Sequence, residues 1–412
     1  MNNKMEEKNL KSFANKRESL LVYERNILKA YFYSFFASIE LTLSIFTLFF
    51  LARDLSMTQI MVLELIFAIF MFVFEVPSGI FADLYGRKNS MAISMFFAAV
   101  AFLIFPLTSS IYIYAIAQIL LALSWAMNSG ADSAWLYDTL KELKKEDRFN
   151  KTFGNYRTIA MITYAFSGLL SIFLAGYYSY EKLFLWTSAI FFLSTLIALS
   201  FKEPPVHKEL HEKNFLKHAK ASFKYAKEHS LVRSLIIYYS VSGALSHLLY
   251  FFLQPYYKSS DLPFFVIGIA VTIYFGATSI GNLLSNRLTK NVKPRKFLTR
   301  VLLVSSISLI IVGLNPLIGL LTLIIYRVLV GVRGIYIEEL INHNIPSSHR
   351  ASIISVKNMG KSTIYLIAAP LLGIISDTYS FAHSILSMGF ALLLFYIFWT
   401  ITSKKYEGKI SD

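Results

Sequence analysis

The sequence predicts an all-α membrane protein with twelve transmembrane helices in two pseudo-symmetric six-helix bundles. Hydrophobic residues make up 55% of the 412 positions, and the mean hydropathy is +0.53. Charged residues account for only 16%, whereas an ordinary soluble domain has about 25%. Twelve apolar runs are long enough to cross a bilayer, and their helical rather than alternating pattern argues against a porin-type barrel.

The apolar runs follow one another closely, apart from one long hydrophilic segment after the sixth. The predicted spans are 27–51, 59–82, 89–108, 111–136, 153–176, 180–201, 232–256, 263–286, 299–314, 317–340, 352–376 and 380–403. We therefore predict a tail at 1–28, a bundle at 29–201, a linker at 202–231, a second bundle at 232–403 and a tail at 404–412. Apolar residues recur at helical spacing among the linker lysines, which indicates either an amphipathic helix on the inner membrane surface or a solvated linker helix.

Lysine and arginine are distributed very unevenly between the two sets of alternate loops. The tails and the even-numbered loops carry 31 of them, and the opposite side carries only Arg53, Lys182 and Lys258. By the positive-inside rule, both termini are predicted to be cytoplasmic in a multi-pass protein of the cell membrane. The net charge of +15 is therefore a consequence of topology, and no nucleic-acid partner is expected.

The loop between spans two and three carries the motif Gly79-Ile-Phe-Ala-Asp83-Leu-Tyr-Gly86-Arg87-Lys88. It resembles the signature of the major facilitator superfamily in sequence and in position. The resemblance implies secondary transport and a gating role for Gly79, Asp83, Gly86, Arg87 and Lys88. A partial copy, Gly281 to Arg287, lies at the end of span eight, with Ser285 at the place of the aspartate. Pro370, Gly373 and Asp377 at the end of span eleven resemble Pro77, Gly79 and Asp83 of span two.

Two other motifs of the superfamily depart from the pattern here. Span four has no arginine, although a related Arg327-x-x-x-Gly331 lies in span ten. Span five lacks the Gly-Pro motif that is common in the proton antiporters of the family. The resemblance to drug/proton antiporters is therefore weaker than the resemblance to the superfamily.

Ionisable residues inside membrane spans are costly, and each is a functional hypothesis by default. In the superfamily, spans one, four, seven and ten line the cavity, which implies cavity positions for several polar residues. The candidates for proton coupling or substrate binding are Glu40, Asn128, Asp132, His247, Arg327 and Arg333. The alternative for each is a static hydrogen bond or salt bridge, which for Asp132 would be to Arg157 or Arg333.

A second group of charges is predicted in the inner half of the bilayer. Its members are Asp138, Arg157, Glu338, Glu339, Lys357 and Lys361. They form either an inner gate that pairs and separates or a static network that offsets the cost of burial. The aromatic candidates for the cavity are Trp125, Tyr238 and Tyr239.

The remaining chemistry is limited by what the sequence lacks. It has no Cys, no Gly-rich ATP-binding loop and no metal-spaced His cluster, so we expect no cofactor, no metal and no enzyme activity. The leading hypothesis is proton-coupled export of small organic or lipophilic cationic compounds by a monomer in the lipid bilayer. The alternative is an uptake symporter or uniporter of a small polar solute, and a scaffold or receptor without transport is a third possibility.

Overall fold

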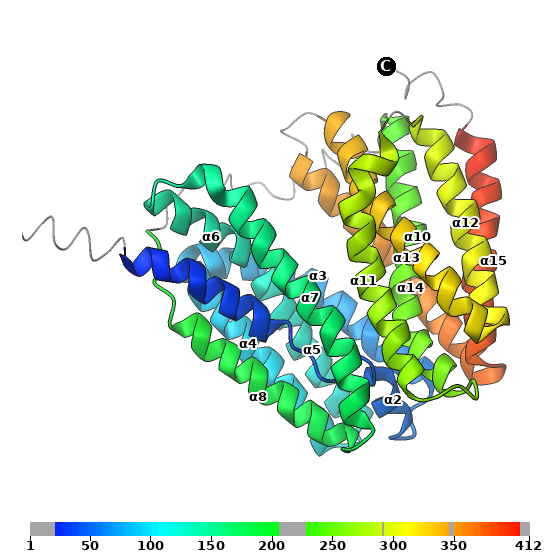
Figure 1. Ribbon diagram of the computed structural model, residues 1–412, viewed down its shortest axis with the longest axis horizontal. Coiled ribbons are helices and arrows are strands. Elements are labelled where there is room, and N and C mark those ends of the chain that lie inside the picture. Colours follow the sequence, from blue (N-terminus) through cyan, green and yellow to red (C-terminus); the bar gives the residue numbers. More distant parts are fainter. Residues whose placement is uncertain (1–20, 206–227, 291, 346–349, 404–412) are drawn as a thin grey trace, which may run out of the picture. The chain divides into compact units, whose positions relative to one another are not determined.

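The computed structural model describes residues 21–205, 228–290, 292–345 and 350–403, which are helical almost throughout (Figure 1). The predicted amphipathic helix of the linker lies outside these residues. A first helix covers 21–37. The others are α2 (Phe46–Leu51), α3 (Met57–Tyr85), α4 (Arg87–Ile104), α5 (Ile111–Asn128), α6 (Ala131–Glu142), α7 (Phe149–Ala175), α8 (Tyr180–Leu199), α10 (Ser230–Lys258), α11 (Phe265–Thr289), α12 (Pro294–Leu314), α13 (Pro316–His343), α14 (Arg350–Thr378) and α15 (Phe381–Thr402).

These helices confirm the predicted fold class. Among the described residues, eleven helical segments are long and apolar enough to cross a membrane, and no strand occurs. Each coincides with one of the predicted spans from the second to the twelfth. The predicted first span is the exception, because it consists of the helix over 21–37 and the short helix α2 with a break between them.

The break in the first span is stabilised by side chains from other helices. An exposed backbone amide is costly in a bilayer, so irregular backbone is tolerated there only where protein groups satisfy it. Three amides in or just after the break have such partners. Leu41 N donates to Thr187 Oγ1 at 3.1 Å, Ser44 N donates to Ser171 Oγ at 3.2 Å, and Thr47 N donates to Gln254 Oε1 at 2.9 Å.

The chain forms two compact units, each with its own core. The first consists of Met1–Leu41, Ile66–Tyr164 and Ser179–Glu209, and the second of Thr42–Leu65, Ala165–Tyr178 and Leu210–Asp412. In the first unit α4 packs against α5 and α8, with Phe102 in contact with Phe184 and Phe191. In the second unit α11 packs against α13, α12 against α15, and α10 against α14.

The close contact between α11 and α13 in the second unit depends on two glycines. A Cβ atom at Gly331 would lie 2.2 Å from the carbonyl oxygen of Thr278, and one at Gly281 would lie 2.1 Å from that of Val328. Both distances are far below van der Waals contact. Helices α11 and α13 therefore touch backbone to backbone, as small residues allow in membrane proteins.

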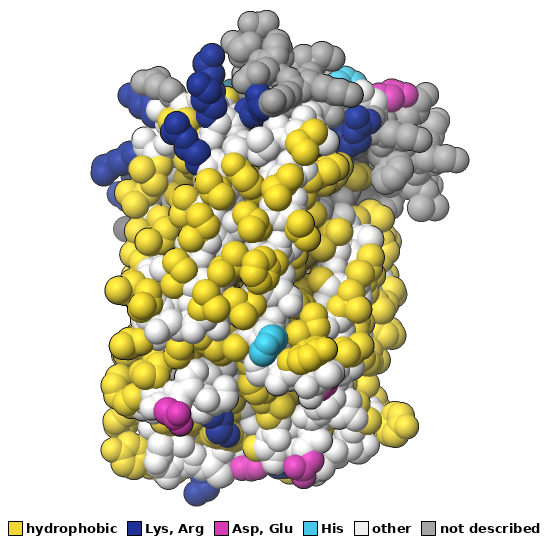
Figure 2. Space-filling model, turned by 90° about the vertical axis from the view of Figure 1, so that its right-hand side faces the viewer, with side chains coloured by type: hydrophobic (Ala, Val, Ile, Leu, Met, Phe, Trp, Pro, Cys, Tyr) yellow, Lys and Arg dark blue, Asp and Glu magenta, His cyan; other side chains and the backbone are white. Residues whose placement is uncertain are grey.

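The outer surface matches a lipid environment. In the face shown in Figure 2, hydrophobic side chains form a broad band, and Lys and Arg side chains gather at one end. Exposed apolar side chains on α13 and α15 include Leu321, Ile325, Leu394 and Phe398. Because these large side chains are exposed in the part of the chain that the structure describes, the band is suited to contact with lipid tails.

Candidate functional site

The first candidate site, in the first unit, surrounds the buried carboxylate of Asp132. Span four is interrupted at Gly130, which has a φ of 77° and separates α5 from α6. Asp132 therefore lies in the first turn of a helix, where its Oδ1 accepts the amide hydrogen of Ser133 at 2.7 Å. The residue is only 5% exposed although it belongs to a membrane span.

Four other side chains complete this acidic site. The hydroxyl of Tyr156 hydrogen-bonds to the Asp132 carboxylate, and Tyr33 donates to Asn128 Oδ1 at 3.3 Å. Arg157 Nη2 lies 3.8 Å from Asp132 Oδ2, with a side chain that is 55% exposed and rests on the Phe153 ring. The structure thus brings Asn128, Asp132 and Arg157 together, with a loose rather than a tight ion pair.

The motif between spans two and three forms a second polar cluster in the same unit. Gly86 has a φ of 95°, which favours glycine, and a Cβ there would lie 3.1 Å from the Glu203 carboxylate. This carboxylate accepts the amide hydrogens of Arg87 at 2.7 Å and Lys88 at 2.8 Å, so it caps the first turn of α4. The Arg87 guanidinium forms an ion pair with Asp138 and donates to the Ala134 carbonyl.

The sequence does not single out Glu203, which lies at the start of the predicted linker over 202–231. Burial raises the pKa of its carboxyl group, although the amides and charges of Arg87 and Lys88 act in the opposite direction. The motif aspartate Asp83 is exposed, and a Cβ at Gly79 would meet no atom within 4 Å. The local contacts of the motif are therefore made by its Gly-Arg-Lys end.

The second unit contains a cavity of about 210 Å³ with a different character. Helices α10, α11, α13 and α14 contribute its walls. The lining residues are Tyr239, Gly243, Ser246, His247, Tyr274, Arg327, Val330, Arg333, Gly334 and Lys361. The cavity thus brings together three residues proposed for proton coupling or substrate binding, His247, Arg327 and Arg333. Lys361 and Tyr239 line the same cavity. We call this the basic cavity.

The two arginines of the basic cavity are held differently. Arg327 Nε donates to the Tyr274 carbonyl at 2.8 Å, and Nη1 donates to Ser246 Oγ at 2.7 Å, while the guanidinium carbon lies 3.4 Å from the centre of the Tyr274 ring. Arg333 Nη2 donates to the Ser242 carbonyl at 2.7 Å, but Nη1 is buried without an acceptor among the described residues. Both side chains are at most 5% exposed.

Lys357 lies next to the cavity and is neutralised. Its Nζ is 2.8 Å from Glu338 Oε1 and 4.3 Å from the centre of the Tyr239 ring. The structure thus pairs two members of the predicted inner network within the second unit, just as Arg87 and Asp138 pair within the first.

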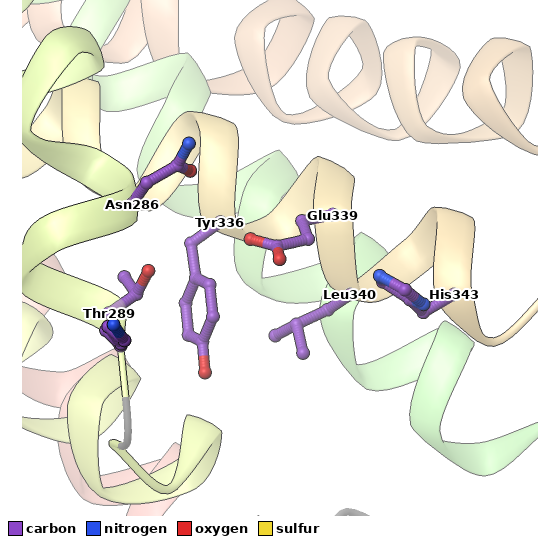
Figure 3. Close-up of a pocket in the computed structure, with 7 residues that line it drawn as sticks. Asn286, Thr289, Tyr336, Glu339, Leu340 and His343 are labelled. Atoms are coloured by element: carbon purple, nitrogen blue, oxygen red, sulfur yellow. The ribbon is translucent and has the colours of Figure 1, made fainter.

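Glu339 lies apart from this pair, in a second cavity of about 410 Å³ at the ends of α11 and α13. Figure 3 shows Asn286 and Thr289 on α11 facing Tyr336 of α13, with Glu339 and His343 further along α13. The partial copy of the motif in the second half of the chain therefore borders a pocket of mixed polarity.

The remaining predicted residues lie elsewhere. Glu40 is half-buried in the break of the first span, close enough to Tyr164 to act on it electrostatically. Trp125 is 57% exposed and packs edge-on against Phe67. Tyr238 is fully buried and donates to the Leu298 carbonyl, so it belongs to the packed core and not to the lining of the basic cavity. No group of three potential metal ligands occurs among the described residues.

Comparisons with known proteins decide the family. The family sequence model of the Major Facilitator Superfamily matches residues 30–265 and 235–411 of this chain. The chain belongs to this superfamily. It is therefore an integral multi-pass membrane protein and a secondary transporter of a small-molecule substrate.

Individual relatives agree with the superfamily. The chain is 26% identical over 396 residues to YxaM of Bacillus subtilis (strain 168), an uncharacterized MFS-type transporter, with 90% of this chain and 95% of the relative covered. Its fold is similar to that of the nucleoside transporter NupG, with a TM-score of 0.72, 14% identity, and coverage of 91% of this chain and 98% of NupG. It is also similar to a D-xylose-proton symporter, with a TM-score of 0.68, 14% identity, and coverage of 92% of this chain and 96% of the symporter. A bacterial homolog of the human lysosomal transporter Spinster is also similar, with a TM-score of 0.73, 14% identity, and coverage of 95% of this chain and 99% of that homolog.

Proposed function

We propose that this superfamily member is a proton-coupled transporter of small organic compounds and that Asp132 binds the coupling proton. The observation that carries the proposal is the burial of Asp132 in span four with only a loose ion pair, 3.8 Å long, to an exposed arginine. A charged carboxylate in a membrane span is costly, so such a group is stabilised either by a cation or by a proton.

The geometry of the acidic site suits alternation between these two states. With Asp132 charged, the Ser133 amide, the Tyr156 hydroxyl and Arg157 all stabilise the carboxylate. With Asp132 protonated, Arg157 loses its counter-charge, and its exposed side chain is free to move toward water. Proton binding is thereby coupled to a change at Arg157, in the N-terminal part of α7. Proton coupling also occurs in a protein of similar fold, the D-xylose-proton symporter.

For the direction of transport, we retain export as the first hypothesis, as in the drug/proton antiporters that the sequence resembles. The alternative is symport into the cell, which the similarity to a D-xylose-proton symporter favours. We further propose that the protein is a monomer in the cell membrane with both termini in the cytoplasm. The concentration of Lys and Arg at one end of the face in Figure 2 agrees with this orientation.

Transport in proteoliposomes tests the proposal. Wild type and Asp132→Asn are reconstituted and given a panel of labelled solutes, including a lipophilic cationic dye and small organic anions, with and without an imposed proton gradient. We expect the gradient to drive at least one solute in wild type, and Asp132→Asn to retain exchange of that solute while losing the response to the gradient. The sign of the driven flux distinguishes export from uptake.

Two controls make this result specific. Asp147→Asn changes an exposed carboxylate in the loop after α6, so it is expected to transport like wild type. A wild-type-like response to the gradient in Asp132→Asn would refute the role of Asp132. If the proton gradient drives no solute of the panel in wild type, the proposal that transport is proton-coupled is refuted.

A further inference from the structure

We propose that the basic cavity binds the anionic group of the substrate, so that the transported compound is a small organic anion with a carboxylate or phosphate group. The inference rests on the proposed function as a transporter of organic compounds, and it specifies the charge of the solute. It differs from the lipophilic cations that the sequence suggested, because such a solute would meet like charge at this cavity.

The first argument is the charge balance of the cavity. Arg327, Arg333 and Lys361 all line it, and no ion pair to any of them occurs among the described residues. Uncompensated cations inside a membrane span are costly, and proteins normally pair them. Lys357 shows this normal behaviour one helical turn away, where Glu338 neutralises it. An anionic ligand would give the cavity the counter-charge that its walls lack.

The surroundings of the cavity do not change this balance. The carboxylate of Glu64 acts electrostatically on Tyr365, whose ring lies 5.5 Å from that of His247. Glu64 itself does not line the cavity, and it is only 6% exposed. His247 faces the same cations, since Arg327 and Lys361 both act on it electrostatically. The side chains that border the cavity are thus basic, aromatic or neutral.

The second argument is an unused hydrogen-bond donor. Arg333 Nη1 is buried without an acceptor although the residue is only 3% exposed and lines the cavity. A buried unsatisfied donor on a charged group costs more than a lost neutral hydrogen bond. Carboxylate and phosphate oxygens are the acceptors that a guanidinium binds most strongly. Lys361 also makes no hydrogen bond to another described residue, so its ammonium is available to the same ligand.

The size and the walls of the cavity indicate which part of the substrate it holds. Its volume of about 210 Å³ is below the range of about 300–1,000 Å³ that is typical of complete ligand sites. It therefore accommodates a charged head group rather than a whole substrate. The rings of Tyr239, Tyr274 and His247 border the cavity and offer apolar surface to the part of the molecule next to that head group.

Equilibrium binding to the purified full-length chain in detergent tests the inference without any proton gradient. Titration calorimetry is performed with benzoate and phenyl phosphate, and the matched controls are neutral benzamide, cationic benzylamine and inorganic phosphate. We expect one or both aromatic anions to bind at least about tenfold more tightly than benzamide, benzylamine and inorganic phosphate.

Two substitutions locate the binding. Arg333→Gln and Lys361→Gln are each expected to weaken binding of the aromatic anion at least about tenfold, whereas Arg300→Gln, at an exposed basic position of α12, leaves it unchanged. The thermal midpoint of the ligand-free variants serves as the folding control. Lys361→Gln should melt no lower than wild type, since it removes an unpaired charge, whereas Arg333→Gln also loses the hydrogen bond to the Ser242 carbonyl. If Arg333→Gln is poorly folded, Lys361→Gln decides, because it removes no described hydrogen bond.

Three results would overturn the inference. Equal affinity for benzamide and benzoate would show that charge is not recognised, and equal affinity for inorganic and phenyl phosphate would show an inorganic-anion site only. Unchanged affinity in Lys361→Gln and Arg333→Gln would place the binding elsewhere. Anion binding together with transport that ignores the proton gradient would refute the proposed coupling by Asp132 but leave this inference intact.

Discussion

Replacement of Gly331 by alanine is expected to separate α11 from α13 and to destabilise the second unit. The new Cβ atom would lie 2.2 Å from the Thr278 carbonyl oxygen, a backbone atom that cannot rotate away. To restore ordinary contact at 3.4 Å, the helices must move apart by about 1.2 Å. The same movement would stretch the hydrogen bond from Arg327 Nε to the Tyr274 carbonyl from 2.8 Å to about 4 Å.

The expected cost combines two effects of this displacement. Overpacking of a well-packed contact costs about 1–3 kcal/mol, and loss of a hydrogen bond from a charged donor costs about 1.5–3 kcal/mol. Alanine offsets about 1 kcal/mol through its higher helix propensity, so the net loss is about 1.5–5 kcal/mol. The measurement is the thermal midpoint of the purified protein in detergent, followed by the dispersity of the eluted peak on size exclusion.

The matched control is Gly276→Ala in α11, where a Cβ atom would meet nothing within 4 Å. It gains the same helix propensity without the clash, so it should melt at or slightly above the wild-type temperature. If Gly331→Ala melts together with Gly276→Ala, the backbone contact between α11 and α13 does not determine the stability of this unit.

Three further predictions concern helix termini and the basic cavity. Asp377→Ala removes the acceptor of the Met57 and Thr58 amides at 2.7 and 2.8 Å, so it should cost about 0.5–2 kcal/mol of stability, measured as a lower thermal midpoint. In the folded protein the raised pKa of Glu203 keeps its carboxyl group protonated to a higher pH than in the unfolded chain. Wild type therefore loses stability as the pH rises above about 4.5, and Glu203→Gln should become more stable relative to it over that range. A stability difference between the two that is independent of pH would contradict this. Arg327→Lys should lower the thermal midpoint, because a lysine ammonium cannot keep both hydrogen bonds that the guanidinium donates. Each lost hydrogen bond of this charged donor costs about 1.5–3 kcal/mol. An unchanged midpoint would show that these bonds contribute nothing to stability.

The sequence predicts the spans well because lipid imposes one requirement on every helix. A run of about 20 apolar residues is sufficient evidence for a span, and no tertiary information is needed. The interruption at Gly130 also has a local cause, since a positive φ favours glycine. The break over 38–45 has none, because this segment contains neither Pro nor Gly. It exists because Thr187, Ser171 and Gln254, which are distant in sequence, supply hydrogen-bond partners to the backbone.

The candidate sites follow the same division between local and distant causes. Intramembrane charge identifies Asp132, Arg327 and Arg333 directly, since each is unusual in an apolar run. The partners of these residues depend on packing: the sequence leaves Arg157 and Arg333 as alternatives for Asp132, and the structure places Arg157 beside it. Glu203 illustrates this limit. Its sequence position indicates only the end of a helix, but its carboxylate caps α4, which begins more than a hundred residues earlier in the chain.

The cations of the basic cavity are not equivalent, and their hydrogen bonds show how the work is divided. Arg327 lies on α13 and donates to the Tyr274 carbonyl of α11 and the Ser246 hydroxyl of α10, so it connects three helices. Of its three nitrogens, only Nη2 makes no hydrogen bond to a described residue. Arg333 uses one nitrogen on Ser242 and keeps the other unpaired, and Lys361 keeps all of its donors. Arg327 is therefore best understood as the residue that positions the walls, because its bonds are directed at backbone and at a wall side chain. Most of the unused donors belong to Arg333 and Lys361, so we expect recognition of an anion to depend mainly on these two side chains. Substitutions at Arg327 should act on stability before they act on affinity.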